Sequence, residues 1–156
     1  MNRLEVTVPS ERREVRMSRE FDAPRELVFR AYTDPDLIPR WWGPRYLTTT
    51  VDRMDVRPGG SWRFVQRAPD GTVHAFHGVY HLVEPPDRIV QTFEYEGERG
   101  HVLLETVTFE DLAGRTRLTT QSVYQSHEDR DGMVAAGMES GVVESMDRLE
   151  QLLAPR

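Results

Sequence analysis

The sequence predicts an α+β domain in which an antiparallel sheet of about six to seven strands curves around one long C-terminal helix. From Thr48 to Tyr124 the chain consists of strand-like segments separated by short turn signals, a pattern typical of an antiparallel meander. Apolar residues then recur at helical spacing from Val134 to Leu153, which indicates an amphipathic helix. Packing the helix on the sheet buries the apolar face of each.

The segments ahead of the meander predict one strand and two short helices. Residues 1–13 are polar, and we expect a flexible N-terminal arm or weak strand. Residues 14–21 alternate apolar and polar side chains, which predicts a half-buried strand. Asp22 is the expected N-cap of a helix that ends at Asp34-Pro35, and Asp36 to Trp41 forms the second helix. A single domain then spans residues 14–154.

Turn signals divide the meander into strands. Pro58-Gly59-Gly60 and Pro69-Asp70-Gly71 are strong turn sequences. The predicted strands cover Thr48–Val56, Ser61–Arg67, Thr72–Glu84, Arg88–Tyr95, His101–Phe109 and Arg115–Tyr124.

The C-terminal helix is expected to begin at a cap, Asp129 or Asp131, and to end near Leu153. Gly137 and Gly141 interrupt its apolar side, at a cost of about 1 kcal/mol per residue in a helix interior. Either the helix backbone packs closely on the sheet there, or the missing side chains leave volume for a ligand. Glycine also permits bending, so this segment is a candidate gate.

Composition excludes several classes of function. The net charge of −6 argues against nucleic-acid binding, which needs a basic patch. No apolar run approaches the ~20 residues of a membrane span, and the N-terminus lacks the apolar core of a signal peptide, so we expect a cytoplasmic protein. The 156 residues include no cysteine and no lysine, which excludes thiolate nucleophiles and Schiff bases.

Metal, hydrolase and nucleotide motifs are absent from the sequence. His74 and His77 point to opposite faces of a predicted strand, and His81 lies too far along it to share an ion. The segment GMESG resembles a nucleophile elbow, but its serine is not central and it lies in a predicted helix. We therefore predict no metal site and no cofactor.

Aromatic side chains are the main candidates for a binding site, because small-molecule sites are mostly apolar with a few polar groups. Each is also a candidate core residue. On the strands, Gln66, Gln121 and Tyr124 are expected to orient the polar end of a ligand. The full predicted ligand-binding set is Trp41, Trp42, Phe64, Gln66, Phe76, Tyr80, Phe93, Gln121, Tyr124, Met138 and Val142.

Glu105 is the candidate catalytic residue. It alternates in phase with Leu103, Val107 and Phe109 and can point inward with them, where an apolar cavity would raise the pKa of its carboxyl group. Asp52 is a similar case. The alternative is that both carboxylates face water or pair with arginine.

Several segments, taken in order, resemble a known family. PRELVFRAYTDPDLIPRWWGP, RPGGSWRF, GVYHLVEPPDRIVQTF and GMESGVVESMDRLEQLL are similar to the activator of heat-shock-protein-90 ATPase homologue family of the START-like (SRPBCC) superfamily. The resemblance implies the helix-grip (START/Bet v-like) fold, with a hydrophobic cavity between the sheet and the C-terminal helix. Members include lipid and polyketide binders, resistance proteins, cyclases and co-chaperone domains, some of them linked to stress response.

Together these patterns favour a binding protein over an enzyme. We expect a small hydrophobic ligand, aromatic, lipid or polyketide-like, in the internal cavity. A cyclase or hydrolase using cavity polar groups is one alternative. A chaperone ATPase-activating domain is another, although no separate domain precedes Glu14 in this sequence. The segment 14–21 is a candidate edge strand, so both a monomer and a homodimer remain open.

Overall fold

One antiparallel sheet forms the framework of the fold. In the computed structural model, which describes residues 2–154, its strand order is β1-β2-β8-β7-β6-β5-β4-β3. The strands are β1 (Glu5–Thr7), β2 (Glu14–Phe21), β3 (Thr48–Met54), β4 (Ser61–Arg67), β5 (Val73–Glu84), β6 (Arg88–Tyr95), β7 (Val102–Leu112) and β8 (Arg115–Val123). The helices are α1 (Arg25–Thr33), α2 (His127–Ala135) and α3 (Met138–Leu153), with short 3-10 helices η1 (Ile38–Arg40) and η2 (Glu96–Glu98).

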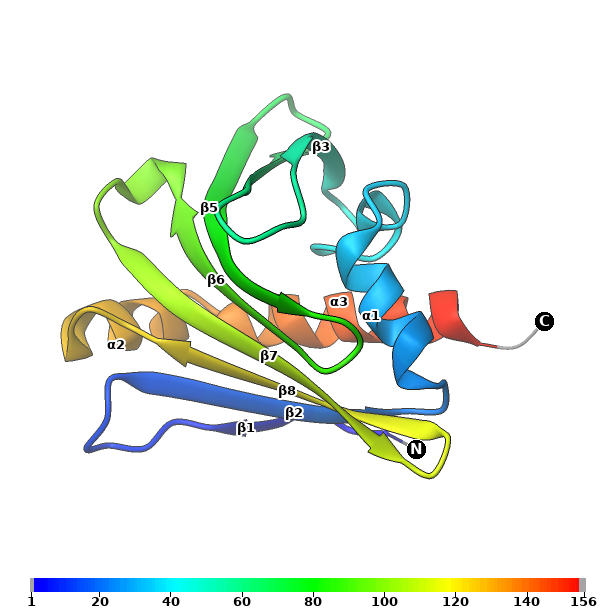
Figure 1. Cartoon of the computed structure of the whole chain (residues 1–156). Coiled ribbons are helices and arrows are strands. Elements are labelled where there is room, and N and C mark those ends of the chain that lie inside the picture. Colours follow the sequence, from blue (N-terminus) through cyan, green and yellow to red (C-terminus); the bar gives the residue numbers. More distant parts are fainter. Residues whose placement is uncertain (1, 155–156) are drawn as a thin grey trace.

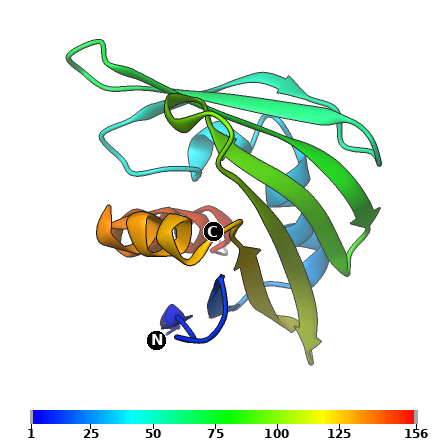
Figure 2. The same ribbon diagram turned by 90° about the vertical axis from the view of Figure 1, so that its left-hand side faces the viewer.

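The sheet curves around α3, which lies along its concave side (Figures 1 and 2). This confirms the predicted helix-grip fold. The sheet has eight strands rather than six to seven, because β1 adds three residue pairs to the edge strand β2. The seven longer strands are those that the turn signals and alternation predicted.

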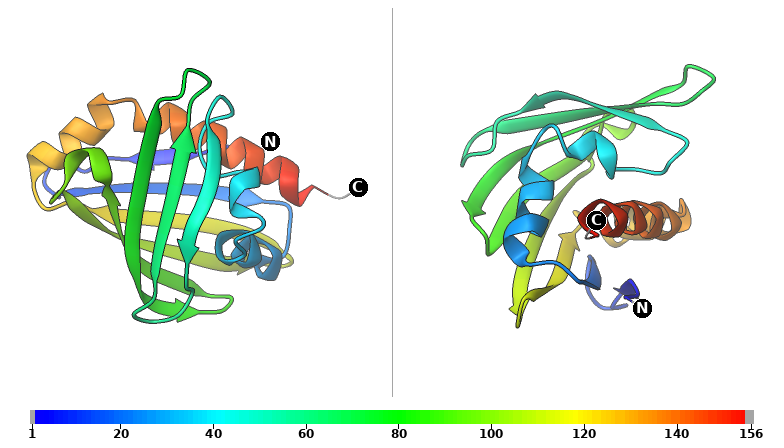
Figure 3. Two further views of the ribbon diagram at one scale, coloured as in Figure 1. Left: turned by 90° about the horizontal axis from the view of Figure 1, so that it is seen from above. Right: turned by 90° about the vertical axis from the view of Figure 1, so that its right-hand side faces the viewer.

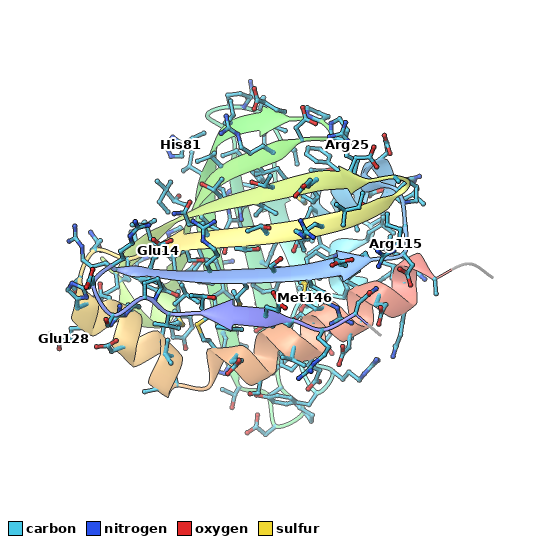
Figure 4. The ribbon with its side chains drawn as sticks, turned by 90° about the horizontal axis from the view of Figure 1, so that it is seen from below. Glu14, Arg25, His81, Arg115, Glu128 and Met146 are labelled. Atoms are coloured by element: carbon cyan, nitrogen blue, oxygen red, sulfur yellow. The ribbon has the colours of Figure 1, made fainter. Side chains whose placement is uncertain are left out.

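A bulge in β5 contributes to the curvature. The register shifts between Tyr80 and Leu82, so His81 is an extra residue in the ladder and projects from the outer surface (Figure 4). A bulge bends its strand and exchanges the faces of the residues that follow. As a result Val83, rather than Leu82, packs against the core.

Helix α1 begins without the predicted cap. Its N-cap is Pro24, and Asp22 instead accepts a hydrogen bond from Nε of Arg115 at 2.7 Å. Asp22 lies two residues ahead of the helix boundary, so it pairs with a strand neighbour. The helix packs on β7 through Phe29, whose ring lies 5.0 Å from that of Phe109. The second short helix covers only Ile38–Arg40 of the predicted segment.

The C-terminal helix is two helices rather than one. Gly137 has φ +83°, in the left-handed region, and separates α2 from α3. Ser126, not Asp129 or Asp131, caps α2, and its hydroxyl accepts a hydrogen bond from the backbone N–H of Asp129. The break also changes which side chains face inward, since Met133 lines the interior while Val134 is exposed.

Figure 3 shows the course of α3 across the molecule, and residues 144–150 of this helix make contacts on two of its sides. On one side the buried guanidinium of Arg19 on β2 pairs with Asp147 at 2.8 Å and Glu150 at 2.9 Å. On the other side Ser145 accepts a hydrogen bond from the backbone N–H of Gly43 at 2.9 Å. Met146, labelled in Figure 4, is buried toward the sheet between these two attachments.

Arg148 continues the second attachment. It donates to the carbonyl of Gly43 at 2.7 Å, while the side chain of Glu144 accepts from the backbone N–H of Arg45. Glu144 and Arg148 lie four residues apart on the helix, a spacing typical of surface ion pairs. Both side chains instead hold the loop that follows η1.

Among residues 2–154, no helix combines the length and the apolar character needed to cross a membrane.

The two helix glycines make opposite predictions for stability. Gly137→Ala is expected to lower the free energy of unfolding by about 1 kcal/mol or more, because an L side chain is strained at φ +83°. Gly141→Ala is expected to raise it by about 0.5–1 kcal/mol, because a Cβ there meets no atom within 4 Å. Urea unfolding of both variants measures the two effects. Shifts of the same sign would contradict this account of the helix break.

Candidate ligand-binding cavity

A cavity of about 310 Å³ lies between the concave face of the sheet, the loop after η1 and the first half of α3. Every predicted ligand-binding residue except Gln121 lines this cavity. These are Trp41, Trp42, Phe64, Gln66, Phe76, Tyr80, Phe93, Tyr124, Met138 and Val142. Their role in binding stays a prediction. Their position around the same cavity follows from the fold.

Gln121 lies on the opposite face of the sheet. Its amide donates to Glu14 at 2.9 Å, on the outer surface that Figure 4 views. Alternation explains the difference, since Thr120, Ser122 and Tyr124 share the inward phase and Gln121 has the outward one.

Trp42 is the centre of the aromatic part of the wall. Its ring meets those of Phe64 and Phe76 edge to face, at centroid distances of 5.1 and 5.3 Å. Trp62 lies 6.5 Å away in a similar orientation. Such edge-to-face pairs restrict ring orientation beyond what burial alone requires. The wall is therefore preorganised rather than a loose set of side chains.

Trp41 lines the cavity and also connects two helices. It is 2% exposed, and its Nε1 donates to the carbonyl of Ala31 at 2.9 Å. This bond joins the end of α1 to η1. The two adjacent tryptophans thus differ, because Trp41 ties helices together and Trp42 presents its ring to the other aromatic side chains.

Backbone contacts of the loop hold Trp42 in place. Thr49 on β3 donates to the Trp42 carbonyl at 2.7 Å, and the next residue, Gly43, contacts α3 through both backbone groups. Gly43 has φ +90°, and a Cβ there would lie 2.0 Å from the side-chain nitrogen of Gln66. Only glycine fits this position, which brings the loop, the sheet and α3 together at one edge of the cavity.

The polar part of the wall is a row across three neighbouring strands. Glu105 on β7 is the register partner of Gln91 on β6 and of Ser122 on β8. Gln91 donates to Glu105 at 3.0 Å, and the hydroxyl of Ser122 lies on the same face beside the carboxyl group. These donors stabilise the charged form, but removal from water opposes it more strongly and raises the pKa of Glu105 above its ordinary value.

Two tyrosines lie near Glu105. Burial is the main cause that raises the pKa of Tyr124 to about 12, and the charge of Glu105 adds to it. The same two causes raise the pKa of Tyr32 on α1. Both phenols are therefore neutral hydrogen-bonding groups across the physiological range.

The sequence reasoning missed Tyr32, Gln91 and Ser122. Tyr32 has the helical spacing of a core residue, and only packing shows that it lines the same cavity as Glu105. Gln91 and Ser122 have the inward phase of their strands, which was a usable signal. Their position beside Glu105 depends on strand register, which alternation does not specify.

The other titratable candidates lie outside the cavity. Asp52 is exposed at the register shift of β3 and lies 3.4 Å from Arg63. His77 contacts Glu94 and Glu96, and His74 contacts the hydroxyl of Tyr95. Within residues 2–154, no three His, Asp or Glu side chains are grouped so that they could hold a metal ion.

The buried carboxyl group predicts a pH-dependent change in stability. Because the pKa of Glu105 is raised, its contribution to stability is present below its ordinary value of 4.5 and is lost as the pH rises through the folded-state pKa. Glu105→Gln removes this loss, so it is expected to raise the melting temperature at pH 8 and to leave it nearly unchanged at pH 4. Glu110→Gln, on the exposed face of β7, is the matched control. Equal shifts at both pH values would contradict the assignment.

Comparisons with known proteins agree with this architecture. A protein from Arthrobacter aurescens is 29% identical, with 96% of this chain and 90% of that chain covered at a TM-score of 0.88. A protein from Rhodobacter sphaeroides is 26% identical (97% and 98% covered, TM-score 0.89), and protein Ms6760 from Mycobacterium smegmatis is 25% identical (97% and 97% covered, TM-score 0.88). No curated protein matches the chain. The model of the Activator of Hsp90 ATPase homolog 1-like protein family matches residues 22–154, and the chain belongs to that family.

Proposed function

We propose that this protein binds a small, mostly apolar molecule in the cavity between the sheet and α3. The observation that carries the proposal is the composition of the cavity wall. Aromatic and aliphatic side chains form most of it, and the polar groups include one row, Gln91, Glu105 and Ser122. A cavity of about 310 Å³ falls in the range of small-molecule sites, which combine these same two features.

The contacts of α3 support a binding role. Residues 145–150 are attached to Arg19 and Gly43, whereas Met138, Gly141 and Val142, nearer the start of the helix, border the cavity. The close backbone packing considered for the two glycines is not present, because a Cβ at Gly141 meets nothing within 4 Å. The missing side chain therefore leaves open space on the cavity side. A ligand there would add contacts to Met138 and Val142, which are only partly buried against the sheet.

Burial is expected to supply most of the affinity. A ligand that removes about 200 Å² of apolar surface from water gains about 5 kcal/mol before the costs of association. Preorganised rings lower those costs, because the wall loses little freedom when the ligand enters. A ligand that binds the folded protein and not the unfolded chain also raises the free energy of unfolding.

Acid–base catalysis is a second candidate, which the position of Glu105 favours. A carboxyl group of raised pKa on a cavity wall beside two tyrosines can hold a proton near a bound molecule. Mass spectrometry of a bound compound before and after incubation distinguishes the two functions, since a binding protein returns it unchanged. The chaperone-activating role stays a prediction from the family.

Filling the cavity is expected to weaken binding at least tenfold. Val142→Phe places a larger side chain in the cavity, whereas Val143→Phe adds the same group at a neighbour that is 37% exposed. Titration with the neutral dye phenylnaphthylamine, followed by its fluorescence, is expected to show at least a tenfold weaker affinity for Val142→Phe and wild-type affinity for Val143→Phe. Equal binding by both variants, or no binding by the wild-type protein, would contradict the proposal.

A further inference from the structure

The cavity wall has an unbalanced charge. Of the described residues that line it, Glu105 carries the one carboxyl group, and none is arginine, lysine or histidine. The chain has 20 basic residues, so this absence is local. An anionic ligand would meet the charge of Glu105 with no cation to offset it, and a purely apolar ligand would leave the carboxylate without a counter-charge.

Polar side chains beside Glu105 favour its carboxylate form, while burial opposes that form. The amide of Gln91 donates to Glu105 at 3.0 Å, and Ser122, its register partner on β8, places a hydroxyl donor on the same face. Two donors on a carboxylate stabilise its negative charge, and neither brings a positive one. The row of Gln91, Glu105 and Ser122 therefore has no positive charge to balance a carboxylate at Glu105.

Electron-rich side chains complete the environment. Tyr32 from α1 and Tyr124 after β8 are near enough to feel the charge of Glu105, and both are neutral phenols. Tyr80 is the register neighbour of Gln91 and lines the same wall. Helix α3 contributes uncharged side chains such as Met138 and Val142. Aromatic faces attract cations as well as apolar rings, most strongly where water is excluded.

We propose that the ligand of this cavity is an apolar amine, whose protonated nitrogen pairs with Glu105 and whose ring or chain lies among Trp42, Phe64 and Phe76. This inference rests on the proposed function and names the ligand class for the same cavity. The ammonium group supplies the counter-charge that the protein lacks, and its N–H groups form charge-assisted hydrogen bonds with the carboxylate. The same charge disfavours carboxylic acids, including fatty acids.

The test compares three probes that share one ring system, naphthylmethylamine, naphthylmethanol and naphthoate, by calorimetry at neutral pH. The amine is expected to bind about tenfold or more tightly than the alcohol, and naphthoate is expected to bind most weakly. Glu105→Gln is expected to remove the preference for the amine while the affinity for the alcohol is retained. Glu110→Gln, which changes an exposed carboxylate on the same strand, is expected to preserve both affinities.

A pH titration of the wild-type protein provides a second test that needs no variant. Acidification toward 4.5 protonates Glu105, so the ratio of amine to alcohol affinity is expected to fall. Equal affinities at neutral pH, or a preference that persists in Glu105→Gln, would overturn the amine assignment and leave the binding function intact. Failure of all three probes and of phenylnaphthylamine to bind would overturn both.

Discussion

Helix α3 is attached to β2 and to the loop after η1 through its residues 145–150, and the cavity depends on this constraint. Arg19 holds the helix to β2, and Gly43 holds it to the loop after η1. Between these attachments Met146 and Leu149 are buried against the core. Nearer the start of the helix, Met138 and Val142 are only partly buried where they pack against the sheet.

The break at Gly137 reinforces this arrangement. A continuous helix would have kept Val134 in phase with Met138 and Val142, as the spacing of three and four suggested. The left-handed residue resets the phase, so Met133 takes the inward position and Val134 is exposed. The first turns of α3 consequently border open volume, and Gly141 leaves that volume free on the cavity side.

The cavity combines two kinds of wall that arise from different causes. Its aromatic part depends on edge-to-face packing around Trp42, which loop contacts at Thr49 and Gly43 keep in place. Its polar part depends on register, which sets Gln91, Glu105 and Ser122 side by side on three strands. A shift of one residue in either ladder would turn one of these side chains to the outer surface. The polar chemistry of this part of the wall is thus a product of strand pairing.

The sequence by itself determined the architecture and much of the apolar wall. Alternation, turn residues and helical spacing are local properties, and they were enough to predict seven strands, the helix on the concave face and Phe64 and Tyr80 as candidates for the apolar wall. For Glu105 they left an inward and a solvent-facing orientation both open. The tertiary structure decided the rest. Gln121 faces outward and Gln91 joins Glu105 because register and bulges arise from contacts between distant segments. The break at Gly137 likewise depends on packing, since glycine permits a left-handed turn but does not require one.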